Sequence, residues 1–356
     1  METIIRKVDC DQMNTQAAKE AIQEAAQILR NGGLVAFPTE TVYGLGGDAL
    51  QKEASGKIYA AKGRPSDNPL IVHIADLAAV DALAAEVSQD ARRLMEAFWP
   101  GPMTLIFKKK ECVPKETTGG LDTVAVRYPN HPAALALLKE SGVYVAAPSA
   151  NLSGRPSPTK ADHVAQDLAG RIDMILDGGS VEIGLESTII DVSQDGAVIL
   201  RPGYITKAMI EKVIGQVSID PAILEEHVHE NLVAKAPGMK YKHYAPKGEL
   251  MLVEGKDVMQ VSQAINDLVK QAVANGKKVA VIATDESQSL YDAPIVKTIG
   301  SRQQVDTVAH SLYDILRQMD ELGVDVIYSE SFQREELGQA IMNRLLKAAG
   351  YHVLRL

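Results

Sequence analysis

Short apolar runs alternate with amphipathic helical runs along most of this chain, and this alternation limits the fold more than any other feature. We expect helices at 15–30, 54–62, 77–86, 89–97, 132–140, 160–169 and 206–214. We expect strands at 34–37, 70–74, 103–107, 124–127, 143–147, 174–176, 187–192 and 198–200. Such alternation of helical and strand-like segments predicts a layered α/β or α+β domain with a mixed sheet.

A second series of elements begins near Glu249 and follows a βαβαβα order. Its expected strands and helices are 250–253, 257–274, 279–283, 303–318, 324–329 and 335–347. This order predicts a small doubly wound, Rossmann-like unit. The turn 284–287 lacks the GxGxxG fingerprint, so we expect no dinucleotide site there.

A length of 356 residues favours two domains, which we place at 1–215 and 249–356 with a linker or lid at 216–248. Within the linker, the stretch 235–247 is bounded by prolines, rich in Lys and Tyr, and free of acids. It would suit a flap over a phosphate or a base, with Tyr244 and either Lys240 or Lys242 near the ligand. A solvated basic connector is the alternative interpretation.

The charge and the cysteines restrict the class of protein. The formal net charge is −9, so an overall basic excess of the kind found in dedicated nucleic-acid binders is absent. The two cysteines have no metal-ligand or CxxC spacing, which fits a reducing compartment. Neither a signal-peptide core nor a transmembrane run is found in the sequence, and we therefore expect a cytoplasmic protein without membrane contact.

The segment 62–70 combines two cations with a proline-restricted backbone. Lys62 and Arg64 precede a hydroxyl, an amide and two prolines, directly before an apolar run. Fixed cations of this kind suit the grip of a phosphate-bearing ligand, because Arg offers a rigid donor fork and Lys a point charge. A basic surface loop is the alternative interpretation.

Four further segments at expected strand ends share small, polar and Pro or Gly residues. They are 38–45, 148–154, 186–188 and 201–203. Ligands of open α/β sheets gather at such loops, so together these segments predict one composite site. From the residues alone, we expect a small-molecule site of nucleotide type with a cation clamp.

The residues in these segments resemble the sequence motifs of a known family. Lys62-x-Arg64 with Ser66-x-Asn68, together with Ser149-x-Asn151, resembles the K-x-R…S-x-N hallmark of the YrdC/Sua5 family. The segments 37–45, 186–191 and 201–203 are similar to recurrent segments of that family. The second half and its connection 237–246 resemble the long, two-domain Sua5 form. The resemblance covers nearly the whole chain.

The resemblance implies an activity and a fold. The family consists of threonylcarbamoyl-AMP synthases, which combine L-threonine, bicarbonate or CO2, and ATP, and release pyrophosphate. Their product serves the t6A modification of adenosine 37 in tRNA, through a downstream tRNA threonylcarbamoyl transferase complex. A weak direct contact with tRNA is conceivable. The implied fold is a YrdC-like twisted mixed sheet with flanking helices around a large cleft, followed by a smaller Rossmann-like Sua5 domain. Mg²⁺ would be held mainly by the ATP phosphates, with no protein metal ligands.

The resemblance also implies residue roles. The catalytic candidates are Lys62, Arg64, Ser149 and Asn151. The ATP-binding candidates are Lys62, Ser66, Thr123, Ser149, Ser157, Arg201 and Tyr244. The threonine-binding candidates are Thr39, His73, Arg127, Ala147 and Ser187. Arg127 would clamp the carboxylate, since guanidinium meets carboxylate bidentately. A strand-end salt bridge is the alternative for Arg127, and a core histidine is the alternative for His73.

Two other functions compete with the synthase. A tRNA- or double-stranded-RNA-binding module without catalysis finds local support in 108–110 and 235–247, and the even negative charge weighs against it. A carbamoyl-transfer domain like that of hydrogenase maturation factors is disfavoured, because the zinc-finger-like cysteines of that context are absent.

Overall fold

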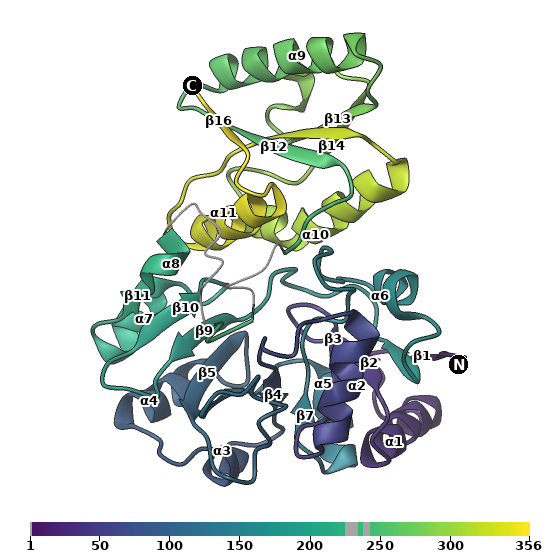
Figure 1. Cartoon of the computed structure of the whole chain (residues 1–356), viewed down its shortest axis with the longest axis vertical. Helices are drawn as coiled ribbons and strands as arrows, with labels where there is room; N and C mark the ends of the chain where they lie inside the picture. The colour runs from purple at the N-terminus through teal and green to yellow at the C-terminus, as the bar shows by residue number, and fades with distance from the viewer. Residues whose placement is uncertain (1, 225–233, 238–242) are drawn as a thin grey trace. The chain divides into compact units, whose positions relative to one another are not determined.

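The chain forms two units in the computed structural model, which describes residues 2–224, 234–237 and 243–356 (Figure 1). The first unit contains the described residues of 2–153, 157–224 and 234–237, and the second those of 154–156 and 243–356. The segment 154–156 therefore leaves the first unit and returns to it. The boundaries 1–215, 216–248 and 249–356 stay a prediction.

The first unit is built on a mixed sheet of eleven strands with the order β1-β8-β2-β3-β7-β4-β6-β5-β9-β10-β11. The strands are β1 (Ile4–Lys7), β2 (Val35–Phe37), β3 (Gly44–Asp48), β4 (Ile71–His73), β5 (Met103–Lys108), β6 (Thr123–Arg127), β7 (Val145–Ala146), β8 (Met174–Asp177), β9 (Thr188–Asp191), β10 (Val198–Arg201) and β11 (Ser218–Ile219). Both parallel and antiparallel pairs occur in it, which confirms the predicted mixed sheet.

Eight helices accompany this sheet in the described part of the unit. They are α1 (Gln16–Arg30), α2 (Lys52–Lys62), α3 (Ala78–Leu83), α4 (Gln89–Phe98), α5 (Pro132–Ser141), α6 (Ala161–Leu168), α7 (Lys207–Ile214) and α8 (Pro221–Leu224). Local signals set their ends: Thr15 caps α1 by accepting from the backbone N–H of Ala18, and Gly63 ends α2 in the left-handed conformation.

Apolar side chains cover both faces of the sheet. In β2, Val35 and Phe37 join a core cluster with residues of α1 and α5, whereas Ala36 between them joins the opposite core cluster. A strand buried on both faces reads as a continuous apolar run, which explains why these strands were visible in the sequence without alternation.

The strand register brings distant residues into line. His73 of β4 pairs with Arg127 of β6 and with Val145 of β7. Arg127 also pairs with Thr104 of β5, and β5 in turn runs parallel to β9. The ends of four strands therefore meet at one place.

The second unit has a five-stranded parallel sheet with the order β14-β13-β15-β12-β16. Its elements are β12 (Glu249–Glu254), α9 (Val258–Ala274), β13 (Val279–Ala283), the 3₁₀ turn η1 (Gln288–Leu290), β14 (Ile295–Thr298), α10 (Val305–Leu322), β15 (Val326–Glu330), α11 (Leu337–Ala348) and β16 (Val353–Arg355). The predicted Rossmann-like unit is confirmed.

The sequence missed five strands: β1, β3, β11, β14 and β16. The segment 38–45 was expected to be a loop throughout, but Gly44 and Leu45 begin β3. A strand written GLGGD carries few side chains with strand propensity, so tertiary pairing with β2 decides its conformation. No helix in the described part of the chain is both long and apolar enough to cross a bilayer.

Candidate substrate site in the first unit

The side chain of Lys62 joins the two halves of the hallmark pattern. Lys62 ends α2 and is only 2% exposed. Its Nζ donates to the backbone oxygens of Ser149, in a short contact, and of Asn151 at 2.5 Å. The ammonium is thus fixed where the loop after β7 passes the end of α2. Two backbone carbonyl oxygens thus hold the amine of Lys62 at a defined position in the first unit.

Arg64 stabilises the loop in which it lies. Its Nη2 donates to the backbone oxygens of Pro69 at 3.0 Å and Asn68 at 3.3 Å. Asn68 is 2% exposed, and its Oδ1 has no hydrogen-bond partner in the described structure. Ser66, by contrast, is exposed. Because both cations of the loop are buried, the alternative of a plain basic surface loop does not describe 62–69.

The loop after β7 is tied to the segment before β3. Gly44 forms a bridge with Ser149, and the backbone N–H groups of Leu45 and Ala150 donate to Pro148 and Tyr43, respectively. The backbone N–H of Ala147 donates to Ile71 of β4 at 2.8 Å. These bonds place Ser149 and Asn151 beside the motif 38–45.

Thr39 has its hydroxyl inside a turn. It accepts from the backbone N–H of Val42 at 3.3 Å, donates to the oxygen of Val42 at 2.7 Å and lies 2.8 Å from the hydroxyl of Thr41. Thr39 is 1% exposed. Its first role in this structure is therefore to close the turn that carries Glu40.

Glu40 and Arg127 form a buried ion pair. Oε1 of Glu40 lies 2.8 Å from Nη2 of Arg127, and both side chains are about 5% exposed. The two groups are not aligned for a hydrogen bond: both carboxylate oxygens, together with Nε and Nη2 of Arg127, lack hydrogen-bond partners in the described structure. The salt bridge proposed as the alternative for Arg127 exists, but it leaves donors and acceptors available to a third, polar group. Sequence reasoning missed Glu40, although it follows Thr39 directly.

His73 is buried beside this pair. It is 3% exposed, its Nδ1 lies 3.1 Å from the oxygen of Ile71, and its ring packs edge-on against Phe37 with centroids 6.1 Å apart. Burial, and then the neighbouring Arg127, lower the pKa of His73 to about 3. The ring is therefore neutral at pH 7. The burial agrees with the alternative of a core histidine, and the threonine-binding role of His73 stays a prediction.

A second chain of contacts links Ser187 with Arg201. The guanidinium of Arg201 donates through Nε and Nη2 to the backbone oxygen of Ser187 at 3.1 and 3.0 Å. The hydroxyl of Ser187 lies 2.7 Å from that of Thr104, which pairs with Arg127. Ser157 donates to Glu186 at 2.6 Å. Glu186 begins one of the predicted site segments, whereas Thr104 is a further polar group of this region that no sequence motif assigned.

Thr123 and Tyr244 have other surroundings within their own units. Thr123 begins β6, and Arg127 ends it, roughly 13 Å away at the usual rise of a strand. Tyr244 belongs to the second unit, where its ring packs against Tyr313 at 5.2 Å and under the guanidinium of Arg344 at 6.0 Å. Lys240 and Lys242 lie outside the described residues.

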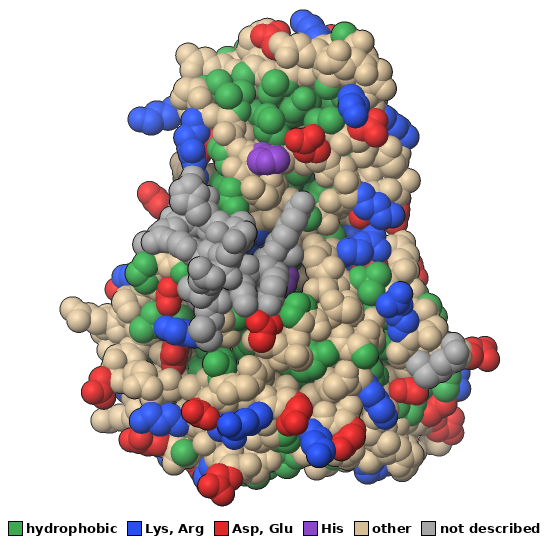
Figure 2. Space-filling model, viewed as in Figure 1, with side chains coloured by type: hydrophobic (Ala, Val, Ile, Leu, Met, Phe, Trp, Pro, Cys, Tyr) green, Lys and Arg blue, Asp and Glu red, His purple; other side chains and the backbone are tan. Residues whose placement is uncertain are grey.

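Neither a metal-ligand cluster nor a basic patch marks the described part of the first unit on the face drawn in Figure 2. No group of three or more His, Cys, Asp or Glu side chains that could hold a metal is found among the residues with described positions. Figure 2 shows acidic and basic side chains intermixed over the first unit on the face that it draws. This intermixing gives no support to a backbone-tracking RNA surface on that face.

Two family models match the chain. One, described as "Telomere recombination" for the Sua5, YciO and YrdC proteins, covers residues 27–203. The other, described as the C-terminal domain of threonylcarbamoyl-AMP synthase, covers residues 205–350.

Full-length relatives are similar over both units. A threonylcarbamoyl-AMP synthase of Bacillus subtilis is 51% identical over 335 residues, which cover 94% of each chain. One from Pyrococcus abyssi is 50% identical over 335 residues, covering 94% of this chain and 95% of the relative. The structure of P. abyssi Sua5 complexed with L-threonine superposes with a TM-score of 0.92 at 48% identity, over 99% of this chain and 100% of that one.

Proposed function

The chain belongs to the Sua5 family of threonylcarbamoyl-AMP synthases, and we propose that it makes threonylcarbamoyl-AMP and pyrophosphate from L-threonine, CO2 or bicarbonate, and ATP. The family and its two-domain form, predicted from the motifs, are confirmed. One observation supports the site best: a buried cation, Lys62, and a buried ion pair, Glu40 with Arg127, lie in one unit on segments that hydrogen bonds connect.

The reaction combines two bond-forming steps. The neutral amine of threonine attacks the carbon of CO2 and loses a proton, which gives a carbamate. A carbamate oxygen then attacks the α-phosphorus of ATP, and pyrophosphate leaves with the electron pair of the broken P–O bond. Neither step needs a covalent enzyme intermediate, so positioning and electrostatic stabilisation supply most of the rate.

The amino acid is assigned to the ends of β4, β6 and β9. Arg127 is positioned for the threonine carboxylate, because its Nε and Nη2 have hydrogen-bonding capacity left. Thr39, His73, Ala147 and Ser187 would surround the rest of the molecule. His73, being neutral, adds no charge that competes with Arg127 for the carboxylate.

The nucleotide is assigned to the loops 62–69 and 148–154. Lys62 and Arg64 would face the phosphates as negative charge shifts to the leaving pyrophosphate, with Ser149 and Asn151 as neighbouring hydrogen-bonding groups. Ser66, Thr123, Ser157, Arg201 and Tyr244 remain predicted ATP contacts. For Arg201 the bonds to Ser187 argue in addition for a structural role at the threonine end.

We propose that Mg²⁺ arrives with ATP. The described residues offer no cluster that would hold the ion, and the acids of the region, Glu40 and Glu186, are already engaged with Arg127 and Ser157. Phosphate oxygens and water suit Mg²⁺ as ligands. No step is assigned to the ion.

The product has a labile mixed anhydride, which requires an acceptor enzyme. We propose that a downstream tRNA threonylcarbamoyl transferase complex takes it for t6A formation, with at most weak direct tRNA contact here, and that the protein works in the cytoplasm. The segment 235–247 would close over the nucleotide and keep water away.

Isotope incorporation tests the proposal. Labelled bicarbonate, L-threonine and ATP should yield one labelled nucleotide product that contains adenine, threonine and the label in equal amounts. Product formation without threonine, or label-free product, would contradict it. If the protein were instead an RNA-binding module without catalysis, no nucleotide product would form. Its affinity for RNA would then fall steeply as the salt concentration rises.

A further inference from the structure

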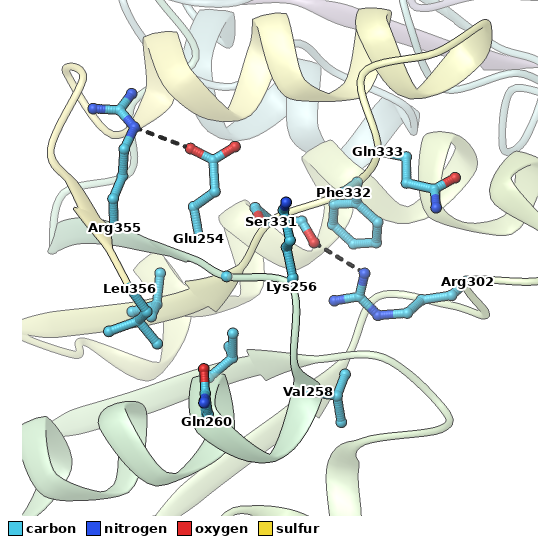
Figure 3. Close-up of a pocket in the computed structure, with 13 residues that line it drawn as sticks. Glu254, Lys256, Val258, Gln260, Arg302, Ser331, Phe332, Gln333, Arg355 and Leu356 are labelled. Atoms are coloured by element: carbon cyan, nitrogen blue, oxygen red, sulfur yellow. Dashed lines mark hydrogen bonds and ion pairs between the residues drawn. The ribbon is translucent and has the colours of Figure 1, made fainter.

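A pocket of about 840 Å³ lies at the carboxyl edge of the second unit's sheet (Figure 3). Residues that follow β12, β14 and β15 line it, together with the end of β16 and the first turn of α9. Its volume falls within the range of small-molecule sites, about 300–1,000 Å³. None of the residues assigned to threonylcarbamoyl-AMP synthesis belongs to it.

The topology of the sheet creates this pocket. After β12 the chain passes through α9 to β13, on the far side of β15, and after β15 it passes through α11 to β16, on the far side of β12. The loops that follow these two adjacent strands therefore leave in opposite directions. In doubly wound sheets the crevice between two such loops is the usual ligand position. The first turn of α9, a helix of 17 residues, also lies at this edge, where Asp257 caps it by accepting from the backbone N–H of Met259 at 2.8 Å.

The side chains around the pocket are mainly cationic and apolar. Among the described side chains that line it, Lys256, Arg302 and Arg355 meet one acid, Glu254, whose carboxylate is already paired with Arg355 at 3.2 Å and with Arg334 at 3.1 Å. Arg302 is itself paired with Glu330, which does not line the pocket. The amine of Lys256 has no ion-pair partner in the described structure, and Figure 3 shows its side chain between those of Glu254 and Arg302. In a chain of net charge −9, this local excess of cations favours an anionic ligand.

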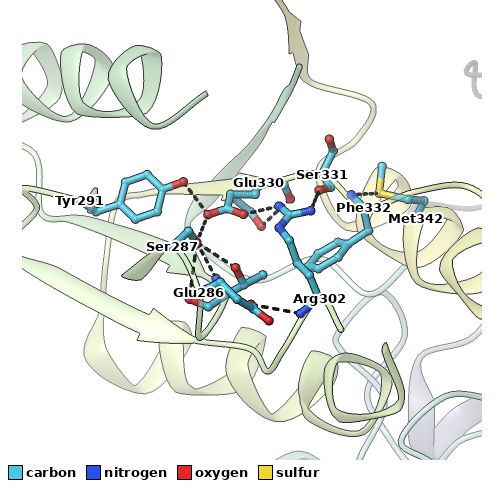
Figure 4. Close-up of polar contacts among 10 residues, drawn as sticks. Glu286, Ser287, Tyr291, Arg302, Glu330, Ser331, Phe332 and Met342 are labelled. Atoms are coloured by element: carbon cyan, nitrogen blue, oxygen red, sulfur yellow. Dashed lines mark hydrogen bonds and ion pairs between the residues drawn. The ribbon is translucent and has the colours of Figure 1, made fainter. Parts of the chain in front are cut away.

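Arg302 is held in place before any ligand arrives. Its Nη2 contacts Oε2 of Glu330, its Nη1 donates to the backbone oxygen of Ser331 at 3.0 Å, and its guanidinium lies 5.0 Å from the ring centroid of Phe332 (Figure 4). Its Nε is buried without a hydrogen-bond partner among the described residues. A cation fixed in this way loses little conformational entropy on binding an anion.

Glu330, which does not itself line the pocket, holds the guanidinium of Arg302 in position. It is 1% exposed and accepts hydrogen bonds from Tyr291 at 2.6 Å and from Ser287. Burial, followed by the bond to Glu330, raises the pKa of Tyr291, so the phenol stays protonated and continues to donate. These contacts occupy both oxygens of the Glu330 carboxylate and hold the Arg302 side chain at the wall of the pocket.

We propose that this pocket binds a small organic monophosphate, with the phosphate between Lys256, Arg302 and the start of α9 and the organic part against Val258 and Phe332. The turn after β13 lacks the glycine-rich fingerprint, so the grip comes from side chains, and a mononucleotide or sugar phosphate fits better than a dinucleotide. This site is independent of the proposed synthase reaction.

Calorimetric titration of the full chain tests the proposal. The Lys62→Ala, Arg64→Ala double variant serves as background to weaken nucleotide binding in the first unit, and the probes are AMP, ribose 5-phosphate, inorganic phosphate and adenosine. At least one organic phosphate should bind with 1:1 stoichiometry, at least tenfold more tightly than adenosine. Adding Lys256→Ala should weaken that binding about tenfold, whereas Lys270→Ala, a matched lysine on the exposed side of α9, should leave it unchanged.

Lys256→Ala is the decisive variant, because Lys256 is exposed and its amine makes no hydrogen bond or ion pair with the described residues. Arg302→Ala should weaken binding further, with the thermal midpoint reporting any loss of folding. The proposal is overturned if none of the phosphates binds, if adenosine binds as tightly as AMP, or if binding is insensitive to Lys256→Ala. Synthase activity plays no part in these readouts, so its absence would not affect them.

Discussion

Glu40 Oε1 lies 2.8 Å from Arg127 Nη2 in a pair whose side chains are each about 5% exposed. A buried ion pair is stable only when both partners are present, because removal of one leaves an uncompensated charge. Since the pair is not aligned as a hydrogen bond, Glu40 fixes the position of the guanidinium and leaves its N–H groups for a carboxylate. Glu40 is accordingly a positioning residue that acts through Arg127.

Glu40→Gln is expected to raise the KM for L-threonine about 10- to 100-fold, since a charge-assisted contact is worth about 1.5–3 kcal/mol. The KM for ATP should change much less, because the loops 62–69 and 148–154 do not depend on the pair. Steady-state kinetics with each substrate varied in turn measures both values. Glu53→Gln, on the exposed face of α2, is the matched control. Equal increases in both KM values would show a general structural defect instead.

Lys62→Met is expected to lower kcat by about 10²–10³-fold, the usual effect of losing one preorganised group at a developing charge. Met fills a similar volume but cannot bond to the oxygens of Ser149 and Asn151. The exposed Lys52→Met, at the other end of α2, should be neutral. A kcat within threefold of the wild type would exclude Lys62 from the reaction.

Gly203→Ala is expected to destabilise the first unit by about 1–3 kcal/mol through overpacking. An added Cβ would lie 2.5 Å from the backbone nitrogen of Thr188 and 2.8 Å from the oxygen of Glu186. Gly56→Ala, in α2, meets nothing within 4 Å and should stabilise by about 0.5–1 kcal/mol. Urea unfolding of both variants measures the difference, and shifts of the same sign would refute the packing argument.

His73 should make stability depend on pH below neutrality. Its pKa is about 3 in the folded protein, below the ordinary value of 6.5, so the unfolded chain binds an extra proton between these values. The contribution of the neutral His73 to the free energy of unfolding is complete above pH 6.5. It falls by up to about 1.4 kcal/mol per pH unit as the pH drops toward 3. His73→Asn should remove this slope. Parallel curves of unfolding free energy for the two proteins between pH 7 and 4.5 would contradict the assignment.

The sequence predicted the elements whose signals are local. The helix expected at 15–30 is Gln16–Arg30, and the one at 89–97 is Gln89–Phe98, because capping residues and apolar periodicity mark their ends. The pattern could not reveal β3, whose glycine-rich residues are strand only through pairing with β2 and β7. Nor could it show that 154–156 leaves the first unit, because that depends on tertiary contacts.

The candidate site was predictable as a set of loops but not as a set of contacts. Motifs pointed to Lys62 and to 149–151, and the structure adds the reason: the ammonium binds the oxygens of that loop. Glu40 was missed because an acid beside a threonine carries no signal until its partner Arg127, far along the chain, is placed next to it by β6.

Pyrophosphate release tests the central claim most directly. Initial rates are measured on the full chain with ATP, L-threonine and bicarbonate, and then with threonine or bicarbonate omitted in turn. The account predicts that release requires all three and that Lys62→Met abolishes most of it. Pyrophosphate release at an equal rate without threonine would contradict the account.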